Sequence, residues 1–276
     1  EDYKDKRNRM MNKTKGTVLY IGGFELPDKN AAAHRVITIG KIFRELNYRV
    51  VYVGVDREAK SSSIDSNKQS YFDFECFAEK YPDNIGRWFN HLVSSKQYIK
   101  LIKKLQNVKI VVFYNFQSIA MRRIMAYCKK NRIKCIADVT EWYQPGGNIV
   151  YRIFKGVDTS YRMKKLHKKC DVIIAISDYL YKYYKADVTV VKIPPLVDVT
   201  DYKWKQFVNE KKKYTFVYAG KASDRKERLD LIIEALSKIN QENIDATMQV
   251  VGMTKEQYLK MYKKMNVRLQ FNFGAE

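Results

Sequence analysis

Residues 17–54 read TVLYIGGFELPDKNAAAHRVITIGKIFRELNYRVVYVG, and this stretch decides the fold of the chain. An apolar, β-branched run at residues 17–21 ends in Gly22 and Gly23, a polar loop follows, and a second apolar run covers residues 50–53. Between the two runs, apolar side chains recur at helical spacing and predict a helix with one apolar face. The opposite, polar face of that helix carries Arg35, Lys41, Arg44 and Glu45. The stretch therefore predicts a β-loop-α-β unit, the half-unit of a doubly wound parallel sheet.

The loop that follows the first predicted strand, residues 22–30, is the place where such a sheet binds its ligand. Doubly wound sheets bind ligands beyond the carboxyl ends of their strands. Glycines let the backbone approach a ligand closely, and the next helix offers unpaired N–H groups to an anion. The glycines do not follow the GxGxxG spacing of dinucleotide enzymes. By itself the stretch fits any phosphate-bearing ligand.

The composition of the 276-residue chain predicts a folded protein with two modest domains, or with one domain and part of another. Hydrophobic residues make up 46%, and no run of 18 apolar residues would form a transmembrane helix. The charged N-terminal segment lacks the apolar core of a secretory signal. Four cysteines lie too far apart in sequence for a short-spaced zinc or redox motif: Cys76, Cys128, Cys135 and Cys170. We expect packed, reduced thiols and a cytoplasmic protein.

A net charge of +22 is the strongest feature of the composition. A surface this basic attracts polyanions, which include nucleic acid, an anionic bilayer and phosphorylated substrates. The alternative is a compositional bias of the source organism, because the lysines are spread along the chain. No RNA- or DNA-binding motif is present, and the aromatic residues follow strand and helix periods. We therefore expect no nucleic-acid partner.

Alternating strands and helices predict one α/β domain with a parallel sheet over residues 16–197. Residues 1–15 are charged and are expected to form a disordered leader. Further strands are predicted at 109–114, 133–138, 171–176 and 188–193, and helices at 88–105, 117–130, 150–169 and 177–184. Residues 56–69 are polar and are expected to form a loop.

A charged linker is predicted at residues 198–213, and the alternation restarts in residues 214–276. Strands are expected at 214–219, 247–251 and 267–271, with helices at 227–240 and 255–265. These two and a half βα units are too few to close a doubly wound domain, so the second domain is expected to be truncated.

A second candidate anion site follows the strand at 214–219. Gly220 ends the strand, and Lys221 and Lys226 precede the next predicted helix. Two cations beside the positive end of a helix dipole suit a diphosphate whose charge rises when its bond to a sugar breaks. The alternative is a solvated lysine-rich turn in a chain that has 52 Lys and Arg residues.

Five segments in a fixed order carry a resemblance to a known family. They are GGFELPDKNAAAHRV (22–36), IADVTEWY (136–143), DVIIAISDYLYKYY (171–184), KIPPLVD (192–198) and FVYAGKASDRKERLDLIIEAL (216–236). In them the chain resembles a family-4 (group 1) glycosyltransferase of the GT-B fold, in which two Rossmann-like domains face a cleft.

The resemblance implies retaining transfer of a hexose-type unit from a nucleotide diphosphate sugar to a glycan or lipid-linked acceptor, in surface or capsular polysaccharide biosynthesis. It implies no metal and no cofactor beyond the donor substrate. By the same resemblance, Gly23 would lie beside the donor diphosphate, with Gly22 shaping the turn. Lys221 and Lys226 would grip that diphosphate.

The resemblance also suggests residues at the acceptor and reacting sugar. Asn30 and His34 would lie where acceptor and sugar meet, and Glu141 and Trp142 follow the fourth strand, where related enzymes contact the acceptor or sugar. Alternatives stay open for both pairs. His34 fits a solvated residue in a first helical turn equally well, and Glu141 with Trp142 fits a helix-start carboxylate beside a buried aromatic.

Three further polar residues predict structural roles. Ser177 at a strand-helix junction is typical of a helix N-cap and not of a nucleophile. His91 and His167 lie in amphipathic helical stretches and are expected to be structural or solvated.

The chain departs from the family after its last predicted strand, because the carboxylate motif that holds the donor sugar and ribose in the family would follow residue 276. Two alternatives to an active transferase therefore remain. One is a truncated, non-catalytic remnant, and the other is a basic module that binds nucleic acid or another anion.

The stretch 150–169 interleaves apolar and basic residues. It predicts either an interfacial helix on an anionic membrane or a core-facing helix with a solvated lysine face. A lipid-linked acceptor favours the first, so we expect the protein to be cytoplasmic and peripheral to the inner face of the cell membrane.

Overall fold

The computed structural model describes residues 14–142, 149–196, 198–199, 214–220, 229–241, 246–262 and 269–270. The chain divides into two compact units, Glu1–Thr200 and Asp201–Glu276. The expected leader and most of the expected linker lie outside the described residues, so the domain boundaries stay predictions.

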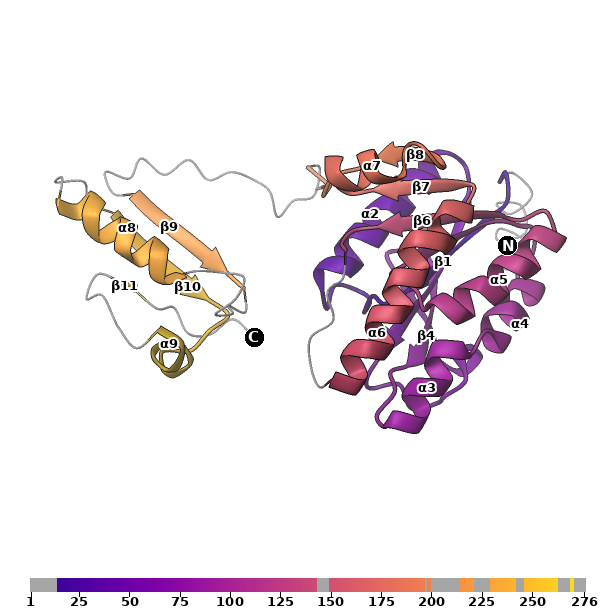
Figure 1. Cartoon of the computed structure of the whole chain (residues 1–276), viewed down its shortest axis with the longest axis horizontal. Helices are drawn as coiled ribbons and strands as arrows, with labels where there is room; N and C mark the ends of the chain where they lie inside the picture. Colours follow the sequence, from indigo (N-terminus) through magenta and orange to yellow (C-terminus); the bar gives the residue numbers. More distant parts are fainter. Residues whose placement is uncertain are drawn as a thin grey trace, which may run out of the picture. The chain divides into compact units, whose positions relative to one another are not determined.

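The first unit is an α/β unit around one sheet (Figure 1). Its strands are β1 (Thr17–Gly22), β2 (Arg49–Asp56), β3 (Lys68–Tyr71), β4 (Phe74–Lys80), β5 (Val108–Tyr114), β6 (Lys134–Val139), β7 (Val172–Ala175) and β8 (Thr189–Lys192). Its helices are α2 (Ala31–Glu45), α3 (Ile85–Val93), α4 (Lys96–Lys104), α5 (Ser118–Lys130), α6 (Ile149–Tyr161) and α7 (Asp178–Tyr184). Short helical turns are η1 (Ile64–Ser66), the π-helical η2 (Arg162–Leu166) and η3 (His167–Lys169).

The opening stretch folds as predicted into β1, α2 and β2. The two strands pair in parallel from Thr17 opposite Arg49 to Ile21 opposite Val53. Side chains alternate between the two faces of a strand, so Leu19 and Ile21 enter one hydrophobic core and Val18 and Tyr20 the other.

The strand order of the sheet is β3-β4-β2-β1-β5-β6-β7-β8, and every pairing except that of β3 with β4 is parallel. The chain builds outward from β1 through β2 to β4, then returns to place β5 on the other side of β1. The boundary between β1 and β5 is therefore the topological switch point, where doubly wound sheets bind their ligands.

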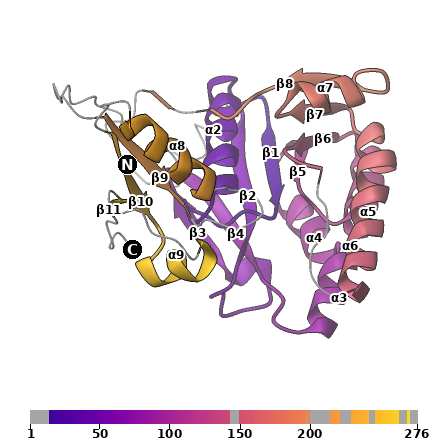
Figure 2. The ribbon, with the colours of Figure 1, turned by 60° about the vertical axis from the view of Figure 1, so that its left-hand side comes forward.

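Each face of the sheet carries its own hydrophobic core. Side chains of α4, α5, η2 and α7 cover one face, whereas α2 covers the other, and Figure 2 shows α2 and α5 on opposite sides. All four cysteines are free and buried, as the composition predicts. Burying apolar side chains on both faces explains why the central strands are continuous apolar runs.

Two local expectations were wrong. Residues 68–80, expected in part to be a loop, form the antiparallel β3–β4 pair, and β4 extends the sheet beside β2. Phe74 and Cys76 of β4 lie in one hydrophobic core, and Phe77 lies in the other. The single helix expected at 88–105 is two helices, because the backbone of Ser94 is extended between α3 and α4.

The basic stretch expected as one helix at 150–169 is α6 followed by η2 and η3. Its apolar side chains do not share one face. Met163 and Leu166 are buried, whereas Ile153 and Val157 are 60% and 64% exposed. The second half therefore matches the core-facing interpretation, and the first half presents apolar side chains to solvent. Within the described residues, no helix is both long and apolar enough to cross a membrane.

The second unit has a smaller parallel sheet. It contains β9 (Tyr214–Ala219), α8 (Leu229–Gln241), β10 (Ala246–Val251), α9 (Lys255–Tyr262) and β11 (Leu269–Gln270), with strand order β11-β10-β9. Leu229, Met248 and Tyr258 are core residues that join α8, β10 and α9. The predicted restart of the βα alternation is confirmed.

Candidate functional site

The candidate site of the first unit lies at the switch point, where the glycine loop leaves β1. Gly22 is level with Tyr114 of β5, and a Cβ atom on Gly22 would lie 2.1 Å from the Tyr114 carbonyl oxygen. Only glycine fits there without moving that backbone. The Gly23 N–H donates a hydrogen bond to the same carbonyl at 3.2 Å. This bond closes the end of the β1–β5 pair.

Gly23 itself is exposed, and a Cβ atom there would meet no atom within 4 Å. The next residue, Phe24, is fully buried, and its carbonyl accepts a hydrogen bond from Val55 N. Because Phe24 fixes the loop against the sheet, Gly23 is held at the carboxyl edge with open space beside it. Its N–H is already used by Tyr114, so a ligand here would meet its Cα face.

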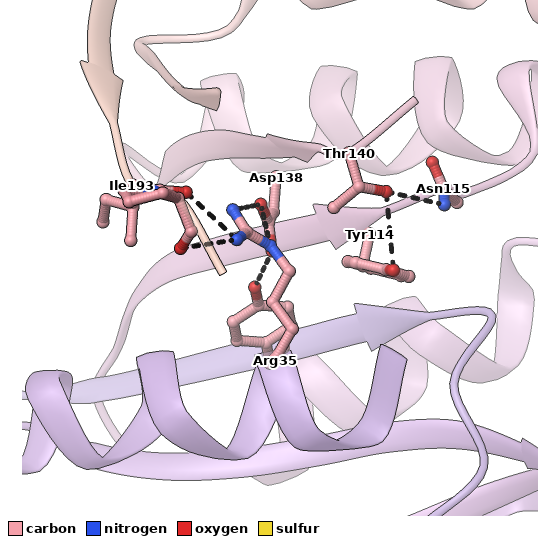
Figure 3. Close-up of polar contacts among 8 residues, drawn as sticks. Arg35, Tyr114, Asn115, Asp138, Thr140 and Ile193 are labelled. Carbon is pink, nitrogen blue, oxygen red and sulfur yellow. Dashed lines mark hydrogen bonds and ion pairs between the residues drawn. The ribbon is translucent and has the colours of Figure 1, made fainter. Parts of the chain in front are cut away.

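A row of polar side chains continues this edge across β5 and β6 (Figure 3). Asn115 Nδ2 donates to Thr140 Oγ1 at 3.3 Å, and Thr140 Oγ1 donates to Tyr114 Oη at 3.4 Å. Burial raises the pKa of the Tyr114 hydroxyl, so it remains a neutral hydrogen-bonding group. The row gives the switch point hydroxyl and amide groups, which suit recognition of sugar hydroxyls.

Glu141 and Trp142 follow β6 directly. Glu141 is exposed, and Trp142 is half-buried with its ring 4.9 Å from that of Tyr183, edge to face. The structure thus places Gly22, Gly23 and Glu141 at the carboxyl edge of one sheet, with β5 between the strands that carry them. Whether Glu141 contacts a substrate stays a prediction.

Asn30 and His34 lie at the start of α2. The Asn30 side chain caps the helix, with its Oδ1 accepting from Ala33 N at 2.9 Å, so this oxygen has a structural task. His34 is exposed in the first turn, as both of its interpretations require. Their proposed roles toward an acceptor stay predictions.

A buried ion pair that the sequence interpretation missed joins α2 to β6. Arg35, expected on the solvated face of α2, is only 7% exposed, and its guanidinium contacts both Asp138 carboxylate oxygens at 2.7–3.1 Å. Tyr20 Oη donates to Asp138 Oδ2 at 2.5 Å. Burial raises the pKa of the Asp138 carboxyl, and the adjacent guanidinium opposes this rise by stabilising the charged form. A charged residue within the apolar strand IADV was the available signal, because a buried carboxylate requires a partner.

Arg35 also fixes the chain where it leaves β8. Its Nη1 donates to the carbonyls of Ile193 and Pro194 at 3.1 and 3.4 Å (Figure 3). Nearby, Lys41 of α2 forms a 2.6 Å ion pair with Asp198. Helix α2 therefore holds the segment that begins the expected linker.

The remaining histidines are more buried than the sequence suggests. His91 Nδ1 lies 2.9 Å from Glu79 Oε2, which also accepts a 2.7 Å hydrogen bond from Tyr98. His167 is buried beside the Tyr184 hydroxyl at 3.0 Å, and burial holds its pKa well below the ordinary value. His167 is therefore neutral at physiological pH and structural.

Buried charges also lie on α6 and η2. Arg162 Nη1 donates to the Phe116 carbonyl at 2.7 Å, and Asp158 Oδ1 accepts from Ser118 N at 2.8 Å. These bonds connect η2 to Phe116, in the loop that leaves the carboxyl edge after β5, and α6 to Ser118, the first residue of α5. Four buried side-chain atoms of the described residues lack a hydrogen-bond partner: His91 Nδ1, Asp158 Oδ2, Thr159 Oγ1 and Arg162 Nε. Two of them lie near a charged group, because Asp158 Oδ2 is 3.6 Å from Arg162 Nη1 and His91 Nδ1 is 2.9 Å from Glu79 Oε2.

Other predicted features lie outside the description or have structural roles. Lys221 and Lys226 fall outside the described residues. Ser177 caps α7 through Leu180 N at 3.4 Å, as predicted. Among the described side chains, no cluster of three or more His, Cys, Asp or Glu is arranged to hold a metal ion. Whether the chemistry involves a metal stays a prediction.

Comparison with known proteins places the fold. No protein-family model matches the sequence, and no curated protein matches it. Among solved structures, the E. coli trehalose-6-phosphate protein bound with UDP-2-fluoro glucose has a TM-score of 0.56 at 9% identity, over 94% of this chain and 74% of that one. The glycotransferase of kitacinnamycin has a TM-score of 0.51 at 10% identity, over 94% and 71%.

A third solved structure shows that the same fold serves another reaction. The UDP-GlcNAc 2-epimerase from Methanocaldococcus jannaschii has a TM-score of 0.50 at 11% identity, over 94% of this chain and 74% of that one. Identities this low establish architecture and leave activity to be argued from the site. The chain therefore has the α/β fold of the GT-B class, with Rossmann-like parallel sheets.

Proposed function

We propose that this chain is a nucleotide-sugar-dependent glycosyltransferase that acts on a glycan or lipid-linked acceptor. The observation that carries the proposal is the switch point, where Gly23 presents open space at the carboxyl edge beside a row of neutral hydrogen-bonding side chains. The fold supports it, because solved neighbours hold UDP-2-fluoro glucose or UDP-glucose. Transfer in place of epimerisation rests on the five family-4 segments of the sequence.

The proposed reaction is retaining hexosyl transfer. The bond between the sugar C1 and the diphosphate oxygen breaks, and an acceptor hydroxyl oxygen forms the new bond to C1. The hydroxyl proton passes to the departing diphosphate. Lys221 and Lys226 stabilise the charge that develops on that diphosphate, a role that preorganised cations perform without a metal. Gly23 leaves room for the diphosphate at the loop, and Gly22 shapes the turn that presents Gly23.

The proposed acceptor side uses residues at the same edge of the first unit. His34 and Glu141 are both exposed and free to meet a sugar hydroxyl, and Trp142 offers an aromatic surface for a sugar ring. Asn30 retains its amide nitrogen for an acceptor, since its oxygen caps α2. We propose surface or capsular polysaccharide assembly as the pathway.

Isothermal titration calorimetry with UDP and with UDP-glucose tests donor binding. Gly23→Leu is the sharpest variant, because the open space tolerates the side chain in the fold while the side chain occupies the ligand position. We expect it and the Lys221→Ala/Lys226→Ala variant to lose binding at least about tenfold. The control is Lys60→Ala/Lys185→Ala, which removes two exposed cations elsewhere in the first unit.

Absence of saturable binding to either nucleotide would count against the transferase. Salt-sensitive binding of an oligonucleotide that UDP-glucose does not compete would favour the basic binding module instead. Sugar transfer is then measured from radiolabelled UDP-glucose to acceptors present in a membrane lipid extract. The assay is run with and without EDTA to examine metal dependence.

We further propose that the exposed half of α6 attaches the protein to an anionic membrane. Ile153, Phe154 and Val157 are 60%, 46% and 64% exposed, and Phe154 packs edge to face on Phe89 of α3 at 5.3 Å. Exposed Arg152 lies beside them in sequence. Exposed apolar side chains next to a cation suit interfacial binding to an anionic membrane.

Co-sedimentation with anionic vesicles tests this attachment. We expect Ile153→Ser/Val157→Ser to reduce the bound fraction severalfold. The matched control, Leu46→Ser/Val191→Ser, removes two apolar side chains of 51% and 47% exposure from other elements. Equal binding of both variants would refute the role of α6.

A further inference from the structure

A second cavity lies at the opposite edge of the same sheet. It lies between α5 and the η2–η3 segment, and its volume is about 710 Å³. A separate, smaller cavity of about 190 Å³ lies beside η1 and α4. The larger cavity is lined in part by Lys134 and Cys135 of β6 and by Asp171, the residue before β7. These are amino ends of parallel strands, so the cavity faces away from the glycine loop.

The rim of this cavity is strongly cationic. Arg122 and Lys129 of α5, Arg132 and Lys169 are all exposed, and the described residues give none of them a carboxylate partner. The fifth cation, Lys134, is paired with Asp171 at 2.6 Å. Asp171 also accepts from Cys135 N at 2.9 Å, so the one carboxylate of the cavity is already used. Four cations therefore remain available to an anion.

The floor of the cavity is apolar. Met125, Ile133 and Tyr161 are half-buried and Leu166 is buried, and all four line the space. Leu166 ends the π-helical turn η2, a conformation often found at functional sites. The thiols that share the floor are protonated, since burial raises the pKa of Cys170 to about 12, and a hydrogen bond with Cys128 together with burial raises that of Cys135. The cavity thus offers cations and apolar contact, without a reactive nucleophile.

We propose that this cavity binds an anionic amphiphile, with a phosphate headgroup on the cationic rim and an apolar chain along the floor. Its volume lies within the roughly 300–1,000 Å³ range typical of small-molecule sites. A hydrophilic polyanion would use the rim and leave the floor wet, so the floor favours a ligand with a hydrocarbon part. The phosphate amphiphile has two sources, a membrane lipid or a soluble alkyl phosphate, which share this chemistry.

Calorimetric titration of the full chain with dodecyl phosphate, below its micellar concentration, tests the proposal. Inorganic phosphate serves as the headgroup alone and dodecyl maltoside as the chain alone. We expect dodecyl phosphate to bind at least about tenfold more tightly than either reference. The Lys129→Gln/Lys169→Gln variant is expected to weaken it about tenfold. Lys60→Gln/Lys185→Gln makes the same charge change outside the cavity and is expected to stay within about twofold.

Vesicles distinguish the two sources. In the Ile153→Ser/Val157→Ser background, which removes the exposed apolar side chains of α6, sedimentation with mixed phosphatidic acid and phosphatidylcholine vesicles that is lost on adding Lys129→Gln/Lys169→Gln and kept on adding the control substitutions would identify the membrane lipid. Dodecyl phosphate binding without such sedimentation would identify a soluble ligand. Equal affinities of the cavity variant and its control would overturn the proposal, as would dodecyl phosphate binding no tighter than inorganic phosphate. Circular dichroism of each variant verifies that the fold is retained.

Discussion

Replacing Arg35 by Met tests the buried ion pair between α2 and β6. The substitution removes three guanidinium contacts of 2.7–3.1 Å from the Asp138 carboxylate, whose side chain is 0% exposed. It also leaves the carbonyls of Ile193 and Pro194 without their donor. Breaking one partner of a buried pair costs about 3–5 kcal/mol, because the other charge stays buried without compensation. We expect Arg35→Met to lower the free energy of unfolding of the first unit by that amount.

Urea denaturation followed by circular dichroism and tryptophan fluorescence measures this change. Lys41→Met is the matched control on the same helix, since the Lys41–Asp198 pair is 43% and 32% exposed and is expected to contribute less than about 1 kcal/mol. The double variant Arg35→Met/Asp138→Leu removes both charges and should be more stable than Arg35→Met alone.

The pH dependence gives an independent check. Without Arg35, the pKa of the buried Asp138 carboxyl rises further above its unfolded value. A raised folded pKa contributes stability at low pH that is lost as the pH rises. The deficit of Arg35→Met relative to wild type should therefore shrink as the pH falls from neutral towards the unfolded pKa of about 4. Two results would refute the reasoning. One is a deficit of Arg35→Met below about 1 kcal/mol at neutral pH, and the other is a cost of Arg35→Met/Asp138→Leu equal to the sum of the costs of Arg35→Met and Asp138→Leu measured singly.

Three further predictions use the same measurements. Gly22→Ala should lower the free energy of unfolding by about 1–3 kcal/mol, because its Cβ would meet the β5 backbone. Gly23→Ala places its Cβ in open space and should change that free energy by less than about 0.5 kcal/mol. Equal costs of the two variants would contradict this prediction. The pKa of His167 in the folded chain is well below 6.5. As the pH drops below 6.5, the imidazole is therefore protonated in the unfolded chain but not in the folded chain, and the free energy of unfolding falls. The loss should reach about 2 kcal/mol near pH 5 and be missing from the pH profile of His167→Gln. Asn30→Ala removes a helix cap and should cost about 1 kcal/mol, with Asn30→Ser recovering most of it in thermal unfolding.

The sequence alone determined the parts of this protein that local pattern dictates. Apolar runs at residues 17–21 and 50–53, joined by one amphipathic helix, suffice to specify a parallel β-α-β unit, because the periods of strand and helix are short-range properties. The cap at Ser177 is equally local. The hairpin at residues 68–80 was not predicted, because the pairing that holds β4 beside β2 is long-range and is set by the tertiary fold.

Only the tertiary structure decided which polar residues act together. Arg35 and Asp138 are 103 positions apart, and an arginine on a helix face has no local feature that says whether it is solvated or paired. The Tyr114, Asn115 and Thr140 row, and the cationic cavity at the other edge, arise in the same way from strand order. Long-range pairing places such groups within bonding distance, and electrostatic interactions depend on distance and burial, which no local spacing encodes.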